Sequence, residues 1–311
     1  MNPLDSASSV ERYLCDRAVD TRTPINGSLE LLPLCNMNCD MCYVRLSKEE
    51  MDRLGRMRTA EEWLAIGRQM KEAGVLFLLL TGGEPLLFPD FQKLYLGLKE
   101  MGMILTINTN ATLITEEMAA FFGKHKPRRI NITLYGKDET SYTDLCHFPG
   151  GFTRTVQGIR LLRKYGVDVK ISSSMTCSNA DDWGDIIALG KELDAPVRID
   201  CYMYPAVRER TLPYHTECRL APEEAAQLRV KVLRAEMGEE LFLKYALATL
   251  QRKSDTLPGE YTPGKVHCMA GRCSFTVNWQ GLMRPCVVMT APEENVFELG
   301  VGEAWEQIWA A

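Results

Sequence analysis

The sequence predicts an α/β fold built on a parallel β-sheet, followed by a smaller unit nearer the C-terminus. Three observations support this prediction. Short apolar runs alternate with longer segments of helical periodicity. The connections between them are short, which favours parallel strands joined by right-handed crossovers. Residues 75–80 are apolar throughout, as in a strand that a parallel sheet buries on both faces.

Six strand–helix units follow one another along the chain. Strands are expected at residues 28–34, 75–80, 103–108, 129–135, 167–175 and 197–203. Helices are expected at residues 59–73, 91–100, 116–122, 153–165, 180–193 and 222–237. Periodicity does not distinguish an open sheet from a partial barrel, but in both folds ligands bind at the carboxyl ends of the strands.

The pattern changes after residue 238. A helical stretch at 239–253 is followed by a turn-rich segment at 254–265. Residues 274–286 then show a hairpin pattern, with the turn near Gln280 and Gly281.

Composition narrows the class of protein and its partners. Apolar residues make up 46% of the chain and charged residues 25%, as in ordinary globular proteins. The net charge is −5 and no basic stripe is visible, so no nucleic acid partner is expected. No apolar run is long enough to cross a bilayer, and the first residues lack the pattern of a secretory signal. We therefore expect a cytoplasmic protein with no membrane partner.

The cysteines fall into two groups and a scattered remainder. In a reducing compartment, clustered cysteines more often bind metal or do chemistry than form disulfides. The first group is Cys35, Cys39 and Cys42, and the second is Cys268, Cys273 and Cys286. The others are expected to be small buried side chains: Cys15, Cys146, Cys177, Cys201 and Cys218.

The first group has the spacing C-x3-C-x2-C and directly follows the first predicted strand. Soft thiolates select zinc or iron–sulfur clusters. A structural zinc site needs four ligands, and a ferredoxin-type cluster normally has four cysteines as well. Three thiolates therefore favour a cubane cluster with one iron left open, and an open position indicates chemistry rather than scaffolding.

This spacing and position resemble the radical S-adenosylmethionine superfamily. Three further motifs occur in the order typical of that family: TGGEP at 81–85, TNATL at 109–113 and NITLYG at 131–136. The resemblance implies a partial (β/α)6 TIM-like barrel at residues 27–238, after an N-terminal extension at 1–26. It also implies a [4Fe–4S] cluster on Cys35, Cys39 and Cys42, whose open iron binds S-adenosylmethionine. An external electron donor, flavodoxin or ferredoxin, would reduce the cluster, and cleavage would yield a 5′-deoxyadenosyl radical.

The resemblance also implies contacts to the cofactor. Gly82 and Gly83 would let the backbone approach the methionyl ammonium, and Glu84 would offset its charge. Asn110, Thr133 and Ser172 (or Ser174) are candidates for the ribose and carboxylate. For each of these three, ordinary hydrogen bonding at a strand end is an equal alternative.

Two positions depart from the family pattern. Relatives commonly have an aromatic residue just before the third cysteine, where this chain has Met41, with Tyr43 one residue beyond that cysteine. A thioether can still pack on an adenine face. Ala111 replaces the more usual glycine of the TNATL motif, and a turn of different shape is expected because alanine rarely adopts positive φ.

The second cysteine group resembles the first half of the SPASM extension, or the shorter twitch extension, of radical enzymes. Residues 239–311 would then hold an auxiliary [4Fe–4S] cluster on Cys268, Cys273 and Cys286, with bound zinc or free thiols as the alternatives. The fourth ligand is open between His267, Cys201, Cys218 and a substrate thiolate. A full SPASM unit would continue past residue 311, so a natural short form and a clipped sequence both fit.

Three kinds of function remain open at this point. A peptide or protein being modified is the favoured substrate, because SPASM units accompany such enzymes. A small-molecule radical enzyme, for cofactor assembly or alcohol oxidation, is the second, and a non-catalytic iron–sulfur or zinc protein the third. Arg198, Asp200 and Tyr202 share one face of the sixth strand and are candidate substrate contacts, as is the charged and aromatic stretch 204–220.

Overall fold

The computed structural model describes residues 9–203, 218–254 and 268–310 of the 311-residue chain. In these residues a nine-stranded sheet has the order β6-β5-β4-β3-β2-β1-β7-β8-β9. Its strands are β1 (Asn26–Glu30), β2 (Phe77–Thr81), β3 (Ile104–Thr109), β4 (Arg129–Thr133), β5 (Val169–Ser174), β6 (Val197–Asp200), β7 (Ser274–Val277), β8 (Leu282–Arg284) and β9 (Glu294–Asn295). Strands β1 to β6 pair in parallel, whereas β8 is antiparallel to β7 and β9.

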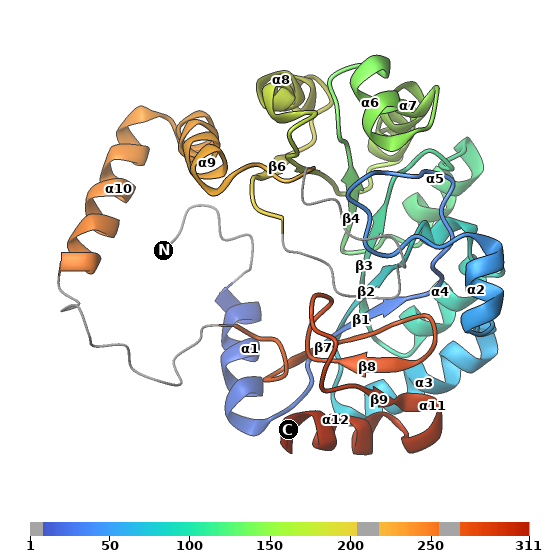
Figure 1. The fold of residues 1–311 in the computed structure, drawn as a ribbon. Coiled ribbons are helices and arrows are strands. Elements are labelled where there is room, and N and C mark those ends of the chain that lie inside the picture. The colour runs from blue at the N-terminus through green and yellow to red at the C-terminus, as the bar shows by residue number, and fades with distance from the viewer. Residues whose placement is uncertain (1–8, 204–217, 255–267, 311) are drawn as a thin grey trace.

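The sheet is curved, and helices cover its outer side (Figure 1). The helices are α1 (Ser9–Thr21), α2 (Lys48–Leu54), α3 (Ala60–Ala73), α4 (Phe91–Glu100), α5 (Glu116–Lys124), α6 (Glu139–Cys146), α7 (Gly151–Lys164), α8 (Trp183–Glu192), α9 (Pro222–Met237), α10 (Glu239–Ser254), α11 (Val296–Leu299) and α12 (Val301–Ala310). None of the helices described has the length and apolar character needed to cross a bilayer.

The predicted α/β fold with a parallel sheet is confirmed. Each of the six expected strands overlaps an observed one, from β1 to β6. The six expected helices correspond to α3, α4, α5, α7, α8 and α9. The sequence patterns do not indicate α1, α2 or α6, of which α2 and α6 span only 7 and 8 residues.

Helix α3 shows why the periodic segments fold where they do. The Thr59 hydroxyl accepts a hydrogen bond from the backbone N–H of Glu62, whose carboxylate in turn accepts one from the Thr59 N–H. This capping box satisfies two backbone donors that a helix start would otherwise leave unpaired. Gly74 ends the helix in the left-handed conformation, and Trp63 and Met70 are fully buried in the core.

The C-terminal hairpin is continuous with the barrel sheet. Strand β7 pairs in parallel with β1, from Asn26 opposite Ser274 to Leu29 opposite Val277. The turn between β7 and β8 contains Gly281 at φ +95°, as the hairpin pattern predicts. The boundary between barrel and tail after residue 238 stays a prediction, and the sheet itself extends into both parts.

Alternation along the strands separates a buried apolar outer face from a half-buried inner face, which is polar in β4 but largely apolar in β2. In β4, Ile130 and Ile132 are fully buried and face the helices, whereas Arg129, Asn131 and Thr133 are only half-buried. A closed barrel fills its interior with branched apolar side chains. Here the inner face instead lines cavities of about 340, 510 and 830 Å³.

Candidate active site

Cys35, Cys39 and Cys42 lie on the loop between β1 and α2, and all three line one cavity of about 340 Å³. The cavity is at the carboxyl ends of the strands, where ligands of such sheets bind. Its wall includes the last residue of four consecutive strands: Thr81, Thr109, Thr133 and Ser174. The structure therefore brings the first cysteine group together with the strand ends.

Hydrogen-bond donors surround the cysteine sulfurs. The backbone N–H of Met37 donates to Cys35 Sγ over 3.4 Å, and the N–H of Arg45 donates to Cys42 Sγ over 3.4 Å. The amide of Asn110 also donates to Cys35 Sγ, over 3.8 Å. Donors of this kind stabilise negative charge on sulfur and adjust the properties of a bound iron–sulfur cluster.

Helix α6 holds the cysteine loop in place. The carbonyl oxygens of Leu145 and Cys146, at the end of this helix, accept hydrogen bonds from the N–H groups of Asp40 and Asn38 at 3.1 and 3.0 Å. The fully buried Cys146 also forms a hydrogen bond with the Cys39 thiol. Cys146 is thus a small buried side chain, as expected, but it directly contacts a predicted cluster ligand.

The cysteine environment disfavours bare thiolates. Burial raises the pKa of Cys35 to about 12, and the negative charges of Glu84 and the neighbouring cysteines act in the same direction. The hydrogen bond from the Met37 N–H lowers this pKa but does not offset the burial. The hydrogen bond with Cys146, followed by burial, raises the pKa of Cys39 well above its usual range. Such thiols ionise together only around a positive centre, which the irons of a cluster provide.

The donor set fits a cluster better than a single metal ion. Among the described residues, no three His, Cys, Asp or Glu side chains are arranged to hold one metal ion. A four-iron cluster holds its cysteines further apart than one ion does, and three soft thiolates on an open cavity suit it. The residues present therefore fit a cluster that keeps one iron free for a ligand.

Glu84 lies behind the cavity wall rather than in it. Its carboxylate is fully buried and accepts hydrogen bonds from the Thr109 hydroxyl at 2.7 Å, the Leu86 N–H at 3.0 Å and the Asn110 N–H at 2.8 Å. Burial raises the pKa of Glu84 to about 7, although these three donors lower it. The carboxyl group thus joins the loops after β2 and β3.

Gly82 and Gly83 line the cavity, and the packing of the cysteine loop gives a further reason for both glycines. A Cβ on Gly82 would lie 2.5 Å from the carbonyl oxygen of Leu32, and one on Gly83 would lie 2.2 Å from that of Leu34. The Gly83 N–H also donates to Leu32 O over 2.7 Å. Any larger residue would push the start of the cysteine loop away from the sheet.

The turn after β3 contains Ala111 in a left-handed conformation. Ala111 adopts φ +60°, so the expectation that alanine avoids positive φ here is wrong. Close packing explains this outcome, because Ala111 is fully buried and its carbonyl oxygen would lie 2.4 Å from a Cβ on Gly158 of α7. Tertiary contacts hold alanine in a conformation that costs about 1–2 kcal/mol locally.

The remaining predicted cofactor residues divide into two sets. Met41, Tyr43, Asn110 and Thr133 all line the cavity. Ser172 lies two residues before the end of β5, and Ser174 rather than Ser172 belongs to the cavity wall. The roles of these residues stay predictions.

Sequence reasoning missed several cavity residues. Asn108, Tyr135 and Val288 line the cavity together with Thr81 and Thr109. Thr81 and Asn108 follow from the strand-end rule combined with period-two alternation, whereas Thr109 follows from the strand-end rule alone, because alternation places it on the opposite face from Asn108. No local signal indicates Val288, which reaches the cavity from the C-terminal hairpin region.

The candidate substrate contacts of the sixth strand lie in two cavities. Tyr202 lines the cysteine cavity, whereas Arg198 lines the cavity of about 830 Å³ and lies 3.6 Å from Asp200. Of the stretch 204–220, residues 204–217 lie outside the described residues.

The second cysteine group is only partly brought together. Cys268 and Cys286 line the cavity of about 510 Å³, on the inner face of β1 to β4. Cys273 is fully buried in an apolar cluster with Cys15 of α1, and burial together with Cys15 raises the pKa of Cys273 to about 11. Sequence reasoning missed the Cys15 contact because nearly the whole chain separates these two residues.

The proposed fourth ligands are not placed beside this group. Cys201 lies just past β6, and the Cys218 carbonyl accepts a hydrogen bond from the Cys177 N–H after β5. Both therefore lie towards the edge of the sheet opposite to the hairpin. His267 lies outside the described residues.

The fold and the cysteine cavity together define a class of enzyme. A curved parallel sheet presents three cysteines after its first strand and leaves room beside them for a second ligand of the cluster. Residues 29–192 match the family model of the Radical SAM superfamily, and the chain therefore belongs to this superfamily. Its enzymes use a [4Fe–4S] cluster and S-adenosylmethionine, so the predicted family, enzyme class and cofactors are confirmed.

Comparison with known proteins identifies relatives of several kinds. The sporulation killing factor maturation protein SkfB of Bacillus subtilis is 21% identical over 95% of this chain, which spans 66% of SkfB. The AdoMet-dependent heme synthase of Methanosarcina barkeri is 24% identical, over 92% of this chain and 83% of that protein. The PqqA peptide cyclase of Rhodopseudomonas palustris is 25% identical, over 85% of this chain and 67% of that protein.

Solved structures share the fold. The structure of Streptococcus suis SuiB bound to its precursor peptide SuiA superimposes with a TM-score of 0.71 at 18% identity, covering 97% of this chain and 70% of SuiB. The structure of anSMEcpe with bound AdoMet gives a TM-score of 0.65 at 21% identity.

Proposed function

We propose that this chain is a radical enzyme that modifies a peptide or protein substrate. The observation that carries the proposal is the set of cavities on the inner face of the sheet, which are lined by both polar and apolar side chains and lie from the cysteine cavity toward the amino ends of the strands. An extended peptide fits such a face, because its backbone and side chains can pair with polar groups along its length. The similarity to SkfB, PqqA peptide cyclase and SuiB supports the same substrate class.

Each part of the site has a separate task in this proposal. Cys35, Cys39 and Cys42 would hold the [4Fe–4S] cluster, which would supply the electron for cleavage of S-adenosylmethionine to a radical able to take a hydrogen atom from the substrate. The N–H donors of Met37, Arg45 and Asn110 stabilise charge on the cysteine sulfurs. Met41 and Tyr43 give the cavity an apolar wall, which suits an adenine ring.

We also assign an auxiliary [4Fe–4S] cluster to Cys268, Cys273 and Cys286. Two of these thiols face the inner cavity of about 510 Å³, where a substrate on the inner face would pass. An external electron donor, flavodoxin or ferredoxin, and a cytoplasmic location complete the proposal.

A small-molecule substrate is the second candidate. The heme synthase of Methanosarcina barkeri matches nearly as much of this chain as SkfB does and has more of its own length matched. A small substrate would need only the cysteine cavity, whereas a peptide would also contact the cavity of about 510 Å³.

The first experiment tests the chemistry. Anaerobically reconstituted, dithionite-reduced protein is expected to convert S-adenosylmethionine to 5′-deoxyadenosine and methionine, which chromatography detects. Alanine at Cys35, Cys39 or Cys42 should abolish this conversion, and iron should fall by about four per chain. Cys177→Ala is the matched control, since Cys177 is exposed and lies outside the cavity.

The second experiment separates the two cysteine groups. Cys268→Ala should lower iron by up to about four per chain while 5′-deoxyadenosine still forms. Equal iron in the wild type and this variant would contradict the auxiliary cluster. Protein that binds zinc instead of iron and forms no 5′-deoxyadenosine would contradict the whole proposal.

A further inference from the structure

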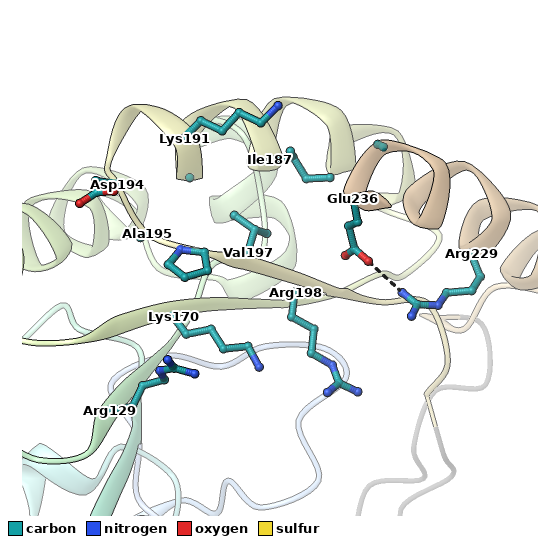
Figure 2. Close-up of a pocket in the computed structure, with 13 residues that line it drawn as sticks. Arg129, Lys170, Ile187, Lys191, Asp194, Ala195, Val197, Arg198, Arg229 and Glu236 are labelled. Carbon is teal, nitrogen blue, oxygen red and sulfur yellow. Dashed lines mark ion pairs between the residues drawn. The ribbon is translucent and has the colours of Figure 1, made fainter. Parts of the chain in front are cut away.

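A cavity of about 830 Å³ lies beside the edge strand β6 and concentrates positive charge (Figure 2). Its lining contains five basic side chains and two acidic ones, although the whole chain carries a net charge of −5. Both acidic residues already have cationic partners. Asp194 pairs with Arg163, and Glu236 lies 3.8 Å from Arg229.

Three of the cations form a row on the inner face. Arg129, Lys170 and Arg198 come from the adjacent strands β4, β5 and β6, and Figure 2 shows their side chains on the same side of the sheet. Lys170 pairs in register with Asn131, two residues beyond Arg129, and Arg198 pairs with Ser172, two residues beyond Lys170. The row therefore crosses the three strands diagonally.

The protein does not fully neutralise this row. Arg129 Nη2 lies 2.9 Å from Asp168 Oδ2, and Arg198 Nε lies 3.6 Å from Asp200 Oδ2. Lys170 forms no ion pair with any residue that the structure describes. Burial, together with the positive charges of Arg198 and Arg129, lowers the pKa of Lys170, although the negative charges of Asp200 and Glu236 act in the opposite direction. Like charges held this close repel one another, and an anion in the cavity would remove that repulsion.

We propose that Arg129, Lys170 and Arg198 form a subsite for a carboxylate of the substrate, and that the substrates are acidic peptides. This inference rests on the proposed function, since Asp, Glu and the C-terminus supply the anionic groups of an unmodified peptide. Guanidinium groups bind carboxylates through paired N–H donors, and Lys170 adds a point charge between the two arginines.

The subsite has a defined distance from the radical chemistry. Thr133 and Ser174 line the cysteine cavity, and each lies four residues beyond a cation on the same strand face: Arg129 in β4 and Lys170 in β5. Four residues of strand correspond to about 13 Å. An extended peptide whose carboxylate occupies the subsite would thus present a residue about four positions away to the cysteine cavity.

Binding of defined probes tests the inference. The probes are an oligoglutamate peptide, an oligoglutamine peptide of the same length, and free glutarate, titrated calorimetrically into the reconstituted full chain. The wild type should bind oligoglutamate at least about tenfold more tightly than either other probe. Lys170→Gln and Arg198→Gln should each weaken oligoglutamate binding about tenfold or more. Arg198→Lys should weaken it less than Arg198→Gln, because lysine keeps the positive charge but lacks the paired N–H donors.

Lys191→Gln is the matched control. Lys191 lines the same cavity but extends from α8, away from the three inner-face cations (Figure 2). Its replacement should leave oligoglutamate binding and 5′-deoxyadenosine formation unchanged. An equal loss of binding in Lys191→Gln and Lys170→Gln would mean that the positive charge of the whole cavity, and not the three inner-face cations, binds the peptide, and this result would overturn the subsite.

The outcomes separate this inference from the proposed function. Wild-type protein that forms 5′-deoxyadenosine but binds both peptides equally, or neither, overturns the subsite and leaves the radical chemistry intact. Glutarate bound as tightly as oligoglutamate overturns the peptide assignment. Wild-type protein that forms no 5′-deoxyadenosine contradicts the proposed function itself. Circular dichroism of each variant confirms that the chain remains folded.

Discussion

Replacing Glu84 by glutamine tests whether this buried carboxyl group joins the two loops that frame the cysteine cavity. The carboxylate accepts three hydrogen bonds, from Thr109, Leu86 and Asn110, so both oxygens are engaged. Glutamine must turn its NH2 group toward at least one of these donors. A buried donor left without an acceptor costs about 1–3 kcal/mol, so Glu84→Gln should lower the free energy of unfolding by about 2 kcal/mol at pH 8.5, where the carboxyl group is ionised.

The pH dependence gives a sharper result. Burial raises the pKa of Glu84 from 4.5 to about 7, so the folded protein binds this proton more tightly than the unfolded chain does. The resulting stability is fully present below pH 4.5 and is lost as the pH rises through about 7. The whole effect is about 3 kcal/mol, of which about 1 kcal/mol falls between pH 6 and 8.5. Because glutamine does not titrate, the difference in unfolding free energy between the wild type and Glu84→Gln should decrease by about 1 kcal/mol from pH 6 to pH 8.5.

Urea unfolding of the reduced, iron-free chain at pH 6 and pH 8.5 measures both effects. The fluorescence of Trp63 and Trp279 reports unfolding, since both are almost completely buried. Glu61→Gln is the control, because Glu61 is an exposed residue that pairs with Lys93 and should change stability little. A deficit that is the same at both pH values would refute the raised pKa, and no deficit would refute the linking role.

Two further substitutions test the cysteine loop. Gly83→Ala places a Cβ 2.2 Å from Leu34 O, so it should lower the free energy of unfolding by more than about 2 kcal/mol and reduce the iron content after reconstitution. Gly184→Ala in α8 is the control, because no atom lies within 4 Å of the added Cβ, and it should raise the free energy of unfolding by about 0.5–1 kcal/mol. Asn110→Ala removes the amide donor 3.8 Å from Cys35 Sγ and should make the cluster's reduction potential more negative, as measured by spectroelectrochemical titration; an unchanged potential would exclude the contact.

Local patterns were sufficient to predict most of the fold. The strands and the helices on the outer side have periodicities that a window of a few residues contains, and the confirmed strands begin or end within a few residues of the expected positions. The first cysteine group was also predictable, because its three members lie on one loop. Helix α6 was missed although it contacts that loop, since it spans only 8 residues.

Features that depend on distant residues could not be predicted. The role of Glu84 as a buried link requires the loop after β3 to be known. Ala111 accepts a left-handed conformation because α7 packs against it through Gly158. The contact between Cys15 and Cys273 forms only when α1 packs beside the start of β7. In each case a tertiary contact, and not local propensity, determines the outcome.

The pairing of β7 with β1 has a consequence for how this protein can be divided. Residues Ser274–Val277 satisfy the outer backbone groups of Asn26–Leu29, and β1 leads directly into the cysteine loop. A fragment ending at residue 238 would expose this strand as an unprotected edge, a common starting point for self-association. The C-terminal hairpin therefore covers the edge of β1 in addition to contributing cysteines. The solubility of shortened variants should be measured before their activity.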